Sequence, residues 1–161
     1  MAERQTGNCT ALLNALKHTH MKKTLFATAL ISVILLQACS RSFEPINYGS
    51  DACAHCRMTI MDERYGAELV DQKGKVFKFD DIVCLKQFVS AQQPSGESLL
   101  FVEDYLQTNQ GMLDARTAVY LHHPFFRSPM NGSIAAFASD SEAKALADSL
   151  QAQSTTWEQI Q

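Results

Sequence analysis

Residues 67–90 have the sequence AELVDQKGKVFKFDDIVCLKQFVS, and they contain the pattern that decides the fold. Ala67–Asp71 is a short, mostly apolar strand candidate. The following Gln72–Gly74 has the composition of a turn, and Lys75–Phe79 then forms the second strand candidate, with Val76, Phe77 and Phe79 as its apolar residues. Two such runs joined by a short segment that contains glycine predict a β-hairpin.

A helix is expected directly after this hairpin. Asp80 and Asp81 are suited to cap and begin it, and it is predicted to end near Ser90. Its apolar residues recur at helical spacing, namely Ile82, Leu85, Phe88 and Val89. A strand predicted at Leu99–Val102 completes a ββαβ order over residues from about 65 to 103.

The second half of the chain, residues 117–160, is predicted to repeat this order. Strands are expected at Thr117–Leu121 and Ile134–Ala138, followed by a helix at Asp140–Leu150 that Asp140 caps, and by a final strand at Thr155–Ile160. Units of about 45 residues are too small to bury much of a core alone. The predicted fold class is therefore α+β, with tandem ββαβ units packed as one small body.

The composition is that of a globular protein. The chain has 161 residues, 46% of them hydrophobic, and a formal net charge of -3. This balance excludes a wholly disordered or low-complexity chain. The sequence also lacks the basic stripe with which proteins bind nucleic acids, so no nucleic-acid partner is expected.

The N-terminal region has the features of a lipoprotein signal peptide at residues 21–38. A short basic segment, Met21-Lys22-Lys23, precedes an uncharged and mostly apolar run, Thr24–Leu36. A run of about a dozen residues suits a signal peptide but is too short for a membrane-spanning helix. The segment Leu36-Gln37-Ala38-Cys39 resembles a bacterial lipobox, which implies cleavage before Cys39 and lipidation of that residue.

The predicted signal peptide determines how the segments before and after it are interpreted. Residues 1–20 are predicted to be an upstream extension, with Met21 as the true start. Residues 39–50 are predicted to form a tether between the lipid anchor and the folded domain at 51–161. Ser40 rather than Asp follows the lipidated cysteine, which favours an outer-membrane anchor that faces the periplasm.

The chemistry of the sequence is concentrated in residues 51–58, DACAHCRM. The spacing of Cys53 and Cys56 allows their sulfurs to share one metal ion or to close a small disulfide. The thioether of Met58 adds a second type of soft donor, and thiolates with thioethers favour Cu(I). Zinc more often recruits a second Cys or His pair. Asp51 and His55 are further candidates for metal ligands, or for groups that support the ligands.

The chain resembles the NosL family along most of its length after the signal peptide. The segments that carry the resemblance are Asp51–Met58, Phe79-Asp80-Asp81 with Cys84, Leu113–Arg116, Ser128–Gly132 and Ile134–Ala138. The resemblance implies a lipoprotein copper chaperone that faces the periplasm and serves the maturation of nitrous oxide reductase. It also implies a fold similar to the tandem ββαβ order.

The resemblance further implies a set of ligands. Cys53 and Met130 match the cysteine and the methionine that family members use, and Cys56 and Met58 belong to the same motif as Cys53. Arg57 stands where glycine is common in the family's motif.

Cys84 is interpreted first as a small buried residue, because it lies near Leu85 and Phe88 on the predicted helix. The alternative is that Cys84 approaches the first motif as a further ligand.

The predicted function is that of a membrane-anchored Cu(I) chaperone that delivers copper to a receiving apo-enzyme and its maturation machinery, with no catalytic step of its own. Entry of Zn(II) as a second metal is left open. Two other functions remain as alternatives. One is a thiol–disulfide oxidoreductase that uses Cys53 and Cys56, and the other is a structural lipoprotein with a loop closed by a disulfide.

Overall fold

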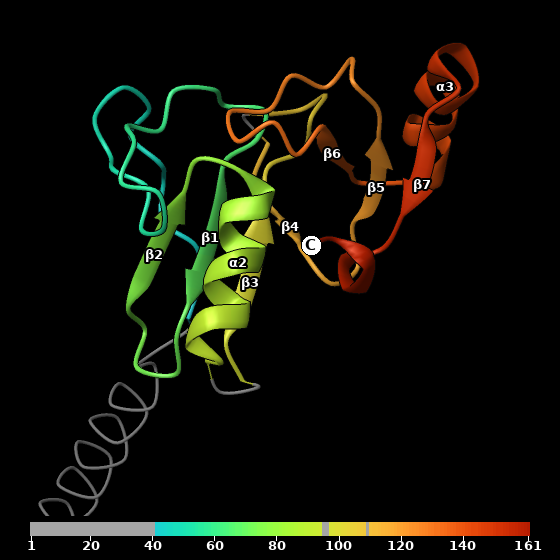
Figure 1. Cartoon of the computed structure of the whole chain (residues 1–161). Helices are drawn as coiled ribbons and strands as arrows, with labels where there is room; N and C mark the ends of the chain where they lie inside the picture. The colour runs from blue at the N-terminus through green and yellow to red at the C-terminus, as the bar shows by residue number, and fades with distance from the viewer. Residues whose placement is uncertain (1–40, 95–96, 109) are drawn as a thin grey trace, which may run out of the picture. The chain divides into compact units, whose positions relative to one another are not determined.

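A computed structural model describes residues 41–161, apart from 95–96 and 109 (Figure 1). The signal peptide at 21–38, the lipidation site Cys39 and the extension 1–20 lie outside the described residues. The elements follow in the order β1 (Ala67–Val70), β2 (Val76–Phe79), α2 (Ile82–Gln92), β3 (Leu99–Val102), β4 (Leu113–Asp114), β5 (Val119–His122), β6 (Ile134–Phe137), α3 (Asp140–Leu150), β7 (Gln153–Thr155) and the 3-10 helix η1 (Trp157–Gln159).

The first half forms a four-stranded antiparallel sheet in the order β2-β1-β3-β4. The predicted hairpin is present, with Val70 opposite Val76 and Ala67 opposite Phe79. Helix α2 packs on β1 and β2 (Figure 1). It begins after Asp81, whose carboxylate accepts a hydrogen bond from the backbone N–H of Val83. This is the geometry of a side-chain N-cap, which satisfies one of the free N–H groups at a helix start.

The second half forms a three-stranded antiparallel sheet in the order β6-β5-β7, against which α3 packs. The ββαβ order is therefore confirmed in both halves. The N-cap of α3 is Ser139, one residue before the predicted Asp140, because the Ser139 hydroxyl accepts from the N–H of Glu142.

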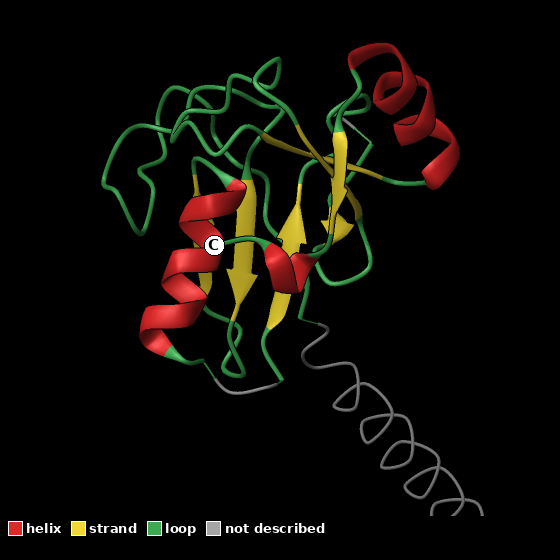
Figure 2. Ribbon diagram, turned by 45° about the vertical axis from the view of Figure 1, so that its right-hand side comes forward, coloured by secondary structure: helices red, strands yellow, loops and turns green. Residues whose placement is uncertain are grey.

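The predicted final strand at Thr155–Ile160 is wrong. Strand β7 ends at Thr155, and Trp157–Gln159 form η1. Thr156 and Gln159 make a capping box that turns the chain into this helix. Lys86 of α2 donates a 2.7 Å hydrogen bond to the carbonyl of Trp157, and η1 accordingly lies beside α2 (Figure 2).

One hydrophobic core joins the two halves. Its buried residues come from β1, β2, α2 and β3 in the first half and from β5, β6 and η1 in the second. They include Leu69, Leu85, Tyr120, Ala136 and Trp157. The described residues thus form one α+β body, as predicted. No helix within the described part of the chain is long and apolar enough to cross a membrane.

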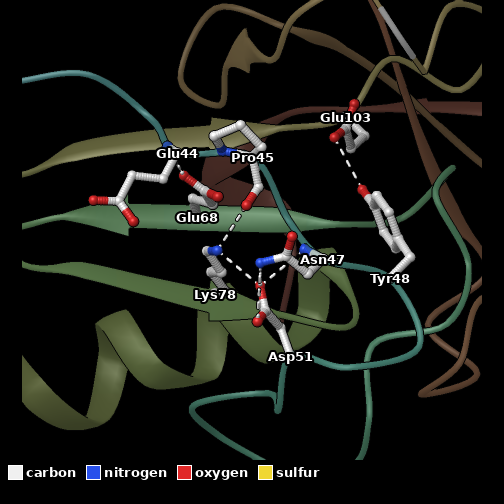
Figure 3. A network of polar contacts seen from close by, with 8 residues as sticks. All are labelled: Glu44, Pro45, Asn47, Tyr48, Asp51, Glu68, Lys78 and Glu103. Atoms are coloured by element: carbon white, nitrogen blue, oxygen red, sulfur yellow. Dashed lines mark hydrogen bonds and ion pairs between the residues drawn. The ribbon is translucent and has the colours of Figure 1, made fainter.

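The segment 41–48, here named the strap, lies on the first sheet. Phe43 packs edge-on against Phe101 of β3, with ring centroids 5.4 Å apart. The backbone N–H of Glu44 donates to the carboxylate of Glu68 on β1, and Lys78 of β2 donates to the carbonyl of Pro45 (Figure 3). The described part of the predicted tether is therefore held against the folded body.

Candidate metal centre

Three cysteines come together at one end of the first sheet. The Sγ atoms of Cys53, Cys56 and Cys84 all lie within 4.8 Å of one another. Cys53 and Cys84 are buried, whereas Cys56 is half-buried, and all three are free thiols. The cluster is thus closed on the protein side and reachable from solvent on the side of Cys56.

A tight loop presents the first two cysteines. Ala52 and Thr59 form an isolated antiparallel bridge, and the N–H of Cys53 donates to the carbonyl of Met58. Arg57 closes the loop in the left-handed region, with a φ of 68°. This is the conformation that glycine adopts without steric cost.

The third cysteine comes from the first turn of α2. Cys84 is the third residue of that helix, three positions after the cap residue Asp81. The loop of the first motif is held against β2 by a hydrogen bond from the N–H of Ala54 to the carbonyl of Lys78. Since β2 leads directly into α2, this contact brings Cys53 and Cys56 to the helix start. The structure thus brings Cys84 to the first motif, the arrangement that the sequence left as the alternative.

Hydrogen bonds within the cluster shift the pKa values of the three thiols in different directions. A hydrogen bond from Cys84, followed by bonds from nearby backbone N–H groups, lowers the pKa of Cys53 well below its usual value despite its burial. The same contact with Cys53, together with burial, raises the pKa of Cys84. Burial and the neighbouring Cys53 also raise the pKa of Cys56. The cluster therefore favours a thiolate at Cys53 over one at Cys56 or Cys84, and metal binding would release the protons that remain on the thiols.

The predicted candidates Asp51 and His55 lie outside this cluster. The Asp51 carboxylate accepts a 2.7 Å hydrogen bond from Lys78 and another from the N–H of Asn47 (Figure 3). The Lys78 contact holds the pKa of Asp51 below its usual value. Asp51 therefore fastens the loop to β2 and the strap, while the side chain of His55 is exposed.

The two predicted methionines differ in their surroundings. Met58 is 52% exposed, whereas Met130 is half-buried and packs against the hydrophobic core that includes Cys53 and Cys84. The backbone N–H of Met130 donates a 2.8 Å hydrogen bond to Asp81. A further methionine, Met61, is 66% exposed, and its N–H donates to Asp80 at the start of α2. Neither the position of Met61 nor the contact of Asp81 with Met130 was predicted from the sequence.

Comparisons with known proteins agree with this architecture. No curated protein matches the chain. The crystal structure of the copper chaperone NosL from Shewanella denitrificans matches with a TM-score of 0.63 and 18% sequence identity, over 76% of this chain and 97% of that one. At this identity the likeness establishes the fold alone.

The family assignment rests on a separate match. The NosL family model matches residues 47–161, which contain the first cysteine motif, the helix with Cys84 and the loop with Met130. The matched region covers both ββαβ units and more than half of the chain. The chain therefore belongs to the NosL family.

Proposed function

We propose that this protein is a copper carrier that holds one Cu(I) ion between Cys53, Cys56 and Cys84 and passes it to a receiving apo-enzyme. The observation that carries the proposal is the cluster of three sulfurs within 4.8 Å of one another. The ion is cargo, and the protein needs no catalytic step to carry it.

The spacing of the sulfurs supports a shared metal ion. Metal–thiolate bonds are about 2.3 Å long, so two sulfurs bound to one ion lie at most about 4.6 Å apart. Small side-chain rotations bring sulfurs that lie within 4.8 Å into that range. Thiolates are ligands that Cu(I), a soft ion, prefers. The described residues add no His, Asp or Glu to the cluster, so a zinc site would have to take its fourth ligand from elsewhere.

The position of Cys84 at a helix start favours a thiolate at that residue. Three thiolates around Cu(I) carry a net negative charge, which is costly to bury. Cys84 lies in the first turn of α2, where the free N–H groups of the helix carry a partial positive charge. The half-exposed Cys56 and the exposed thioether of Met58 provide a route for ligand exchange with a partner.

The proposal extends to the setting of the protein. Family membership and the lipobox at Leu36–Cys39 support a lipid-anchored protein of the cell envelope, facing the periplasm from the outer membrane. Family membership also supports nitrous oxide reductase, together with its maturation machinery, as the recipient of the copper. The Cys39→Ala variant is expected to leave the membrane fraction while it keeps its copper stoichiometry. Persistent membrane association of this variant would contradict the lipid anchor.

An anaerobic competition titration tests the copper proposal. The reduced protein is titrated against a chromophoric Cu(I) chelator, in wild type and in the Cys53→Ala, Cys84→Ala and Cys39→Ala variants. We expect tight binding of one Cu(I) per chain, lost in Cys53→Ala, weakened in Cys84→Ala and unchanged in Cys39→Ala. A wild-type protein that does not compete with the chelator would overturn the copper proposal.

A further inference from the structure

The loop that carries Met130 is folded tightly on itself. The N–H of Asn131 donates to the carbonyl of Ser128, and the N–H of Ser133 donates to the Ser128 hydroxyl. Asn131 and Ser133 both have a positive φ, at 57° and 55°. Such a loop has a defined shape of its own. The position of Met130 therefore depends on where the loop is attached to the rest of the fold.

The attachment is the buried carboxylate of Asp81. Its Oδ1 accepts a 2.8 Å hydrogen bond from the N–H of Val83, which caps α2. Its Oδ2 accepts a 2.8 Å hydrogen bond from the N–H of Met130. Asp81 is wholly buried, and hydrogen bonds to a buried carboxylate are stronger than those between neutral groups. One side chain therefore joins the start of the cysteine-bearing helix to the methionine-bearing loop.

The close packing of Gly132 supports this attachment independently. A Cβ atom added to Gly132 would lie 2.3 Å from Cγ2 of Val83 and 3.6 Å from Oδ1 of Asp81. The first distance is shorter than any real contact, so the loop approaches α2 as closely as only a glycine allows. The loop is held at the helix start by shape as well as by the hydrogen bond.

We propose that Asp81 is a positioning residue: it holds the Met130 loop at the start of the cysteine-bearing helix and so sets the place of Met130, the methionine that the resemblance to the NosL family implies as a ligand. The proposal rests on the proposed copper-binding function. It assigns Asp81 two separable tasks, since Oδ1 caps the helix and Oδ2 holds the loop. If Asp81 served only as a helix cap, loss of the hydrogen bond from Met130 to Oδ2 would leave copper binding unaffected.

The variant Asp81→Ser separates these tasks. Serine is about as good an N-cap as aspartate, so its hydroxyl keeps the bond to Val83 while the acceptor for Met130 is lost. Asp81→Asn is the second variant, because it keeps one acceptor oxygen but can turn an NH₂ group towards the Met130 N–H. Gly132→Ala is the third variant, because its added Cβ pushes the loop away from Val83 on α2. Ser139→Ala, which removes the cap of α3, is the matched control for the loss of a helix cap.

The first readout requires no copper. Amide hydrogen exchange of the full-length reduced protein is expected to show faster exchange at Met130 in Asp81→Ser, by about tenfold or more, as for the loss of one hydrogen bond to a charged group. The Val83 amide is expected to keep its protection. Unchanged exchange at Met130 would overturn the attachment by Asp81, whatever the protein binds.

The second readout is Cu(I) affinity by chelator competition. We expect Asp81→Ser to weaken binding by about as much as Met130→Ala does, and the double variant to be no weaker than either single one, because both act through the same ligand. Ser139→Ala should lower stability without a change in affinity. Wild-type affinity in Asp81→Ser, with weakened binding in Met130→Ala, would overturn the positioning role alone. Failure of the wild type to bind Cu(I) would overturn the proposed function, and this inference with it.

Discussion

Cys84 illustrates, at the scale of single residues, what the sequence could and could not predict about the site. The Cys53 and Cys56 pair is recognisable from spacing alone. Cys84 lies among apolar helix positions, so its surroundings in the sequence favoured a small buried residue. It is buried, but against two other sulfurs. The contact that brings them together, from Ala54 to the carbonyl of Lys78, joins residues far apart in the chain and leaves no local signal.

Arg57 carries the first prediction at this scale. Its left-handed backbone, with a φ of 68°, is strained for a residue with a Cβ. Replacement by glycine removes this strain but increases the conformational entropy of the unfolded chain. We expect Arg57→Gly to raise the free energy of unfolding of the metal-free protein by up to about 1 kcal/mol. Urea denaturation of the reduced protein measures the change.

Arg57→Ala is the matched control for this variant. It removes the same charged side chain but keeps the Cβ, so it should not show the gain in stability. A stability of Arg57→Gly below that of Arg57→Ala would contradict the role of the backbone conformation at this position.

At the scale of elements, the strands and helices with strong local patterns were predictable. The hairpin, α2 and α3 appear where turn residues, helix caps and apolar spacing indicated them. Strand β4 was missed because it has two residues and exists only through its pairing with Phe101 and Val102 of β3. A strand was predicted at Thr155–Ile160, but the capping box of Thr156 and Gln159 turns the chain into η1.

The strap contributes an interaction that depends on pH. It covers two buried glutamates, since Glu44 donates its N–H to Glu68 and the Tyr48 hydroxyl donates to Glu103 at 2.9 Å (Figure 3). One carboxylate oxygen of Glu68 and one of Glu103 are buried and have no hydrogen-bond partner among the described residues. Burial raises the pKa of each of these glutamates to about 7. Both are therefore more readily ionised in the unfolded chain than in the folded protein.

The direction of the pH effect follows from these values. Between the ordinary pKa of 4.5 and the folded value of about 7, the folded protein binds more protons than the unfolded chain. The free energy of unfolding therefore decreases as the pH rises through this range. We expect the metal-free protein to be more stable at pH 5 than at pH 7.5, by about 1–3 kcal/mol for each of the two carboxyls. Denaturant titrations at both pH values measure the difference.

Variants at the two glutamates test the origin of this effect. Glu68→Gln and Glu103→Gln should each reduce the pH dependence, because an amide does not ionise. Glu97→Gln, which changes an exposed carboxyl, should leave most of it in place. An unchanged pH dependence in the double Glu68→Gln, Glu103→Gln variant would show that other groups cause it.

At the scale of the whole molecule, the proposed site is assembled from separate parts of one body. The loop of the first motif supplies Cys53 and Cys56, α2 supplies Cys84, and the loop between β5 and β6 is held to α2 through Asp81. These parts meet only in the folded chain. A ligand that binds the folded protein and not the unfolded one stabilises the fold.

Copper binding is therefore expected to raise the melting temperature. With Cu(I) buffered at about 100 times its dissociation constant or more, the rise should exceed about 5 °C for a domain of this size. Cys84→Ala should show a much smaller rise under the same buffer, and Cys39→Ala should behave as wild type. Scanning calorimetry under anaerobic conditions makes this comparison. Equal shifts in Cys84→Ala and wild type would remove Cys84 from the site.

The most direct test of the three-cysteine site is X-ray absorption at the copper K-edge. In the Cu(I)-loaded wild type we predict a first shell of sulfur only, at about 2.3 Å, with three thiolates and the thioether of Met130. In Cys84→Ala we predict one sulfur fewer. A shell of nitrogen or oxygen ligands, or the same two-sulfur shell in both proteins, would contradict the account.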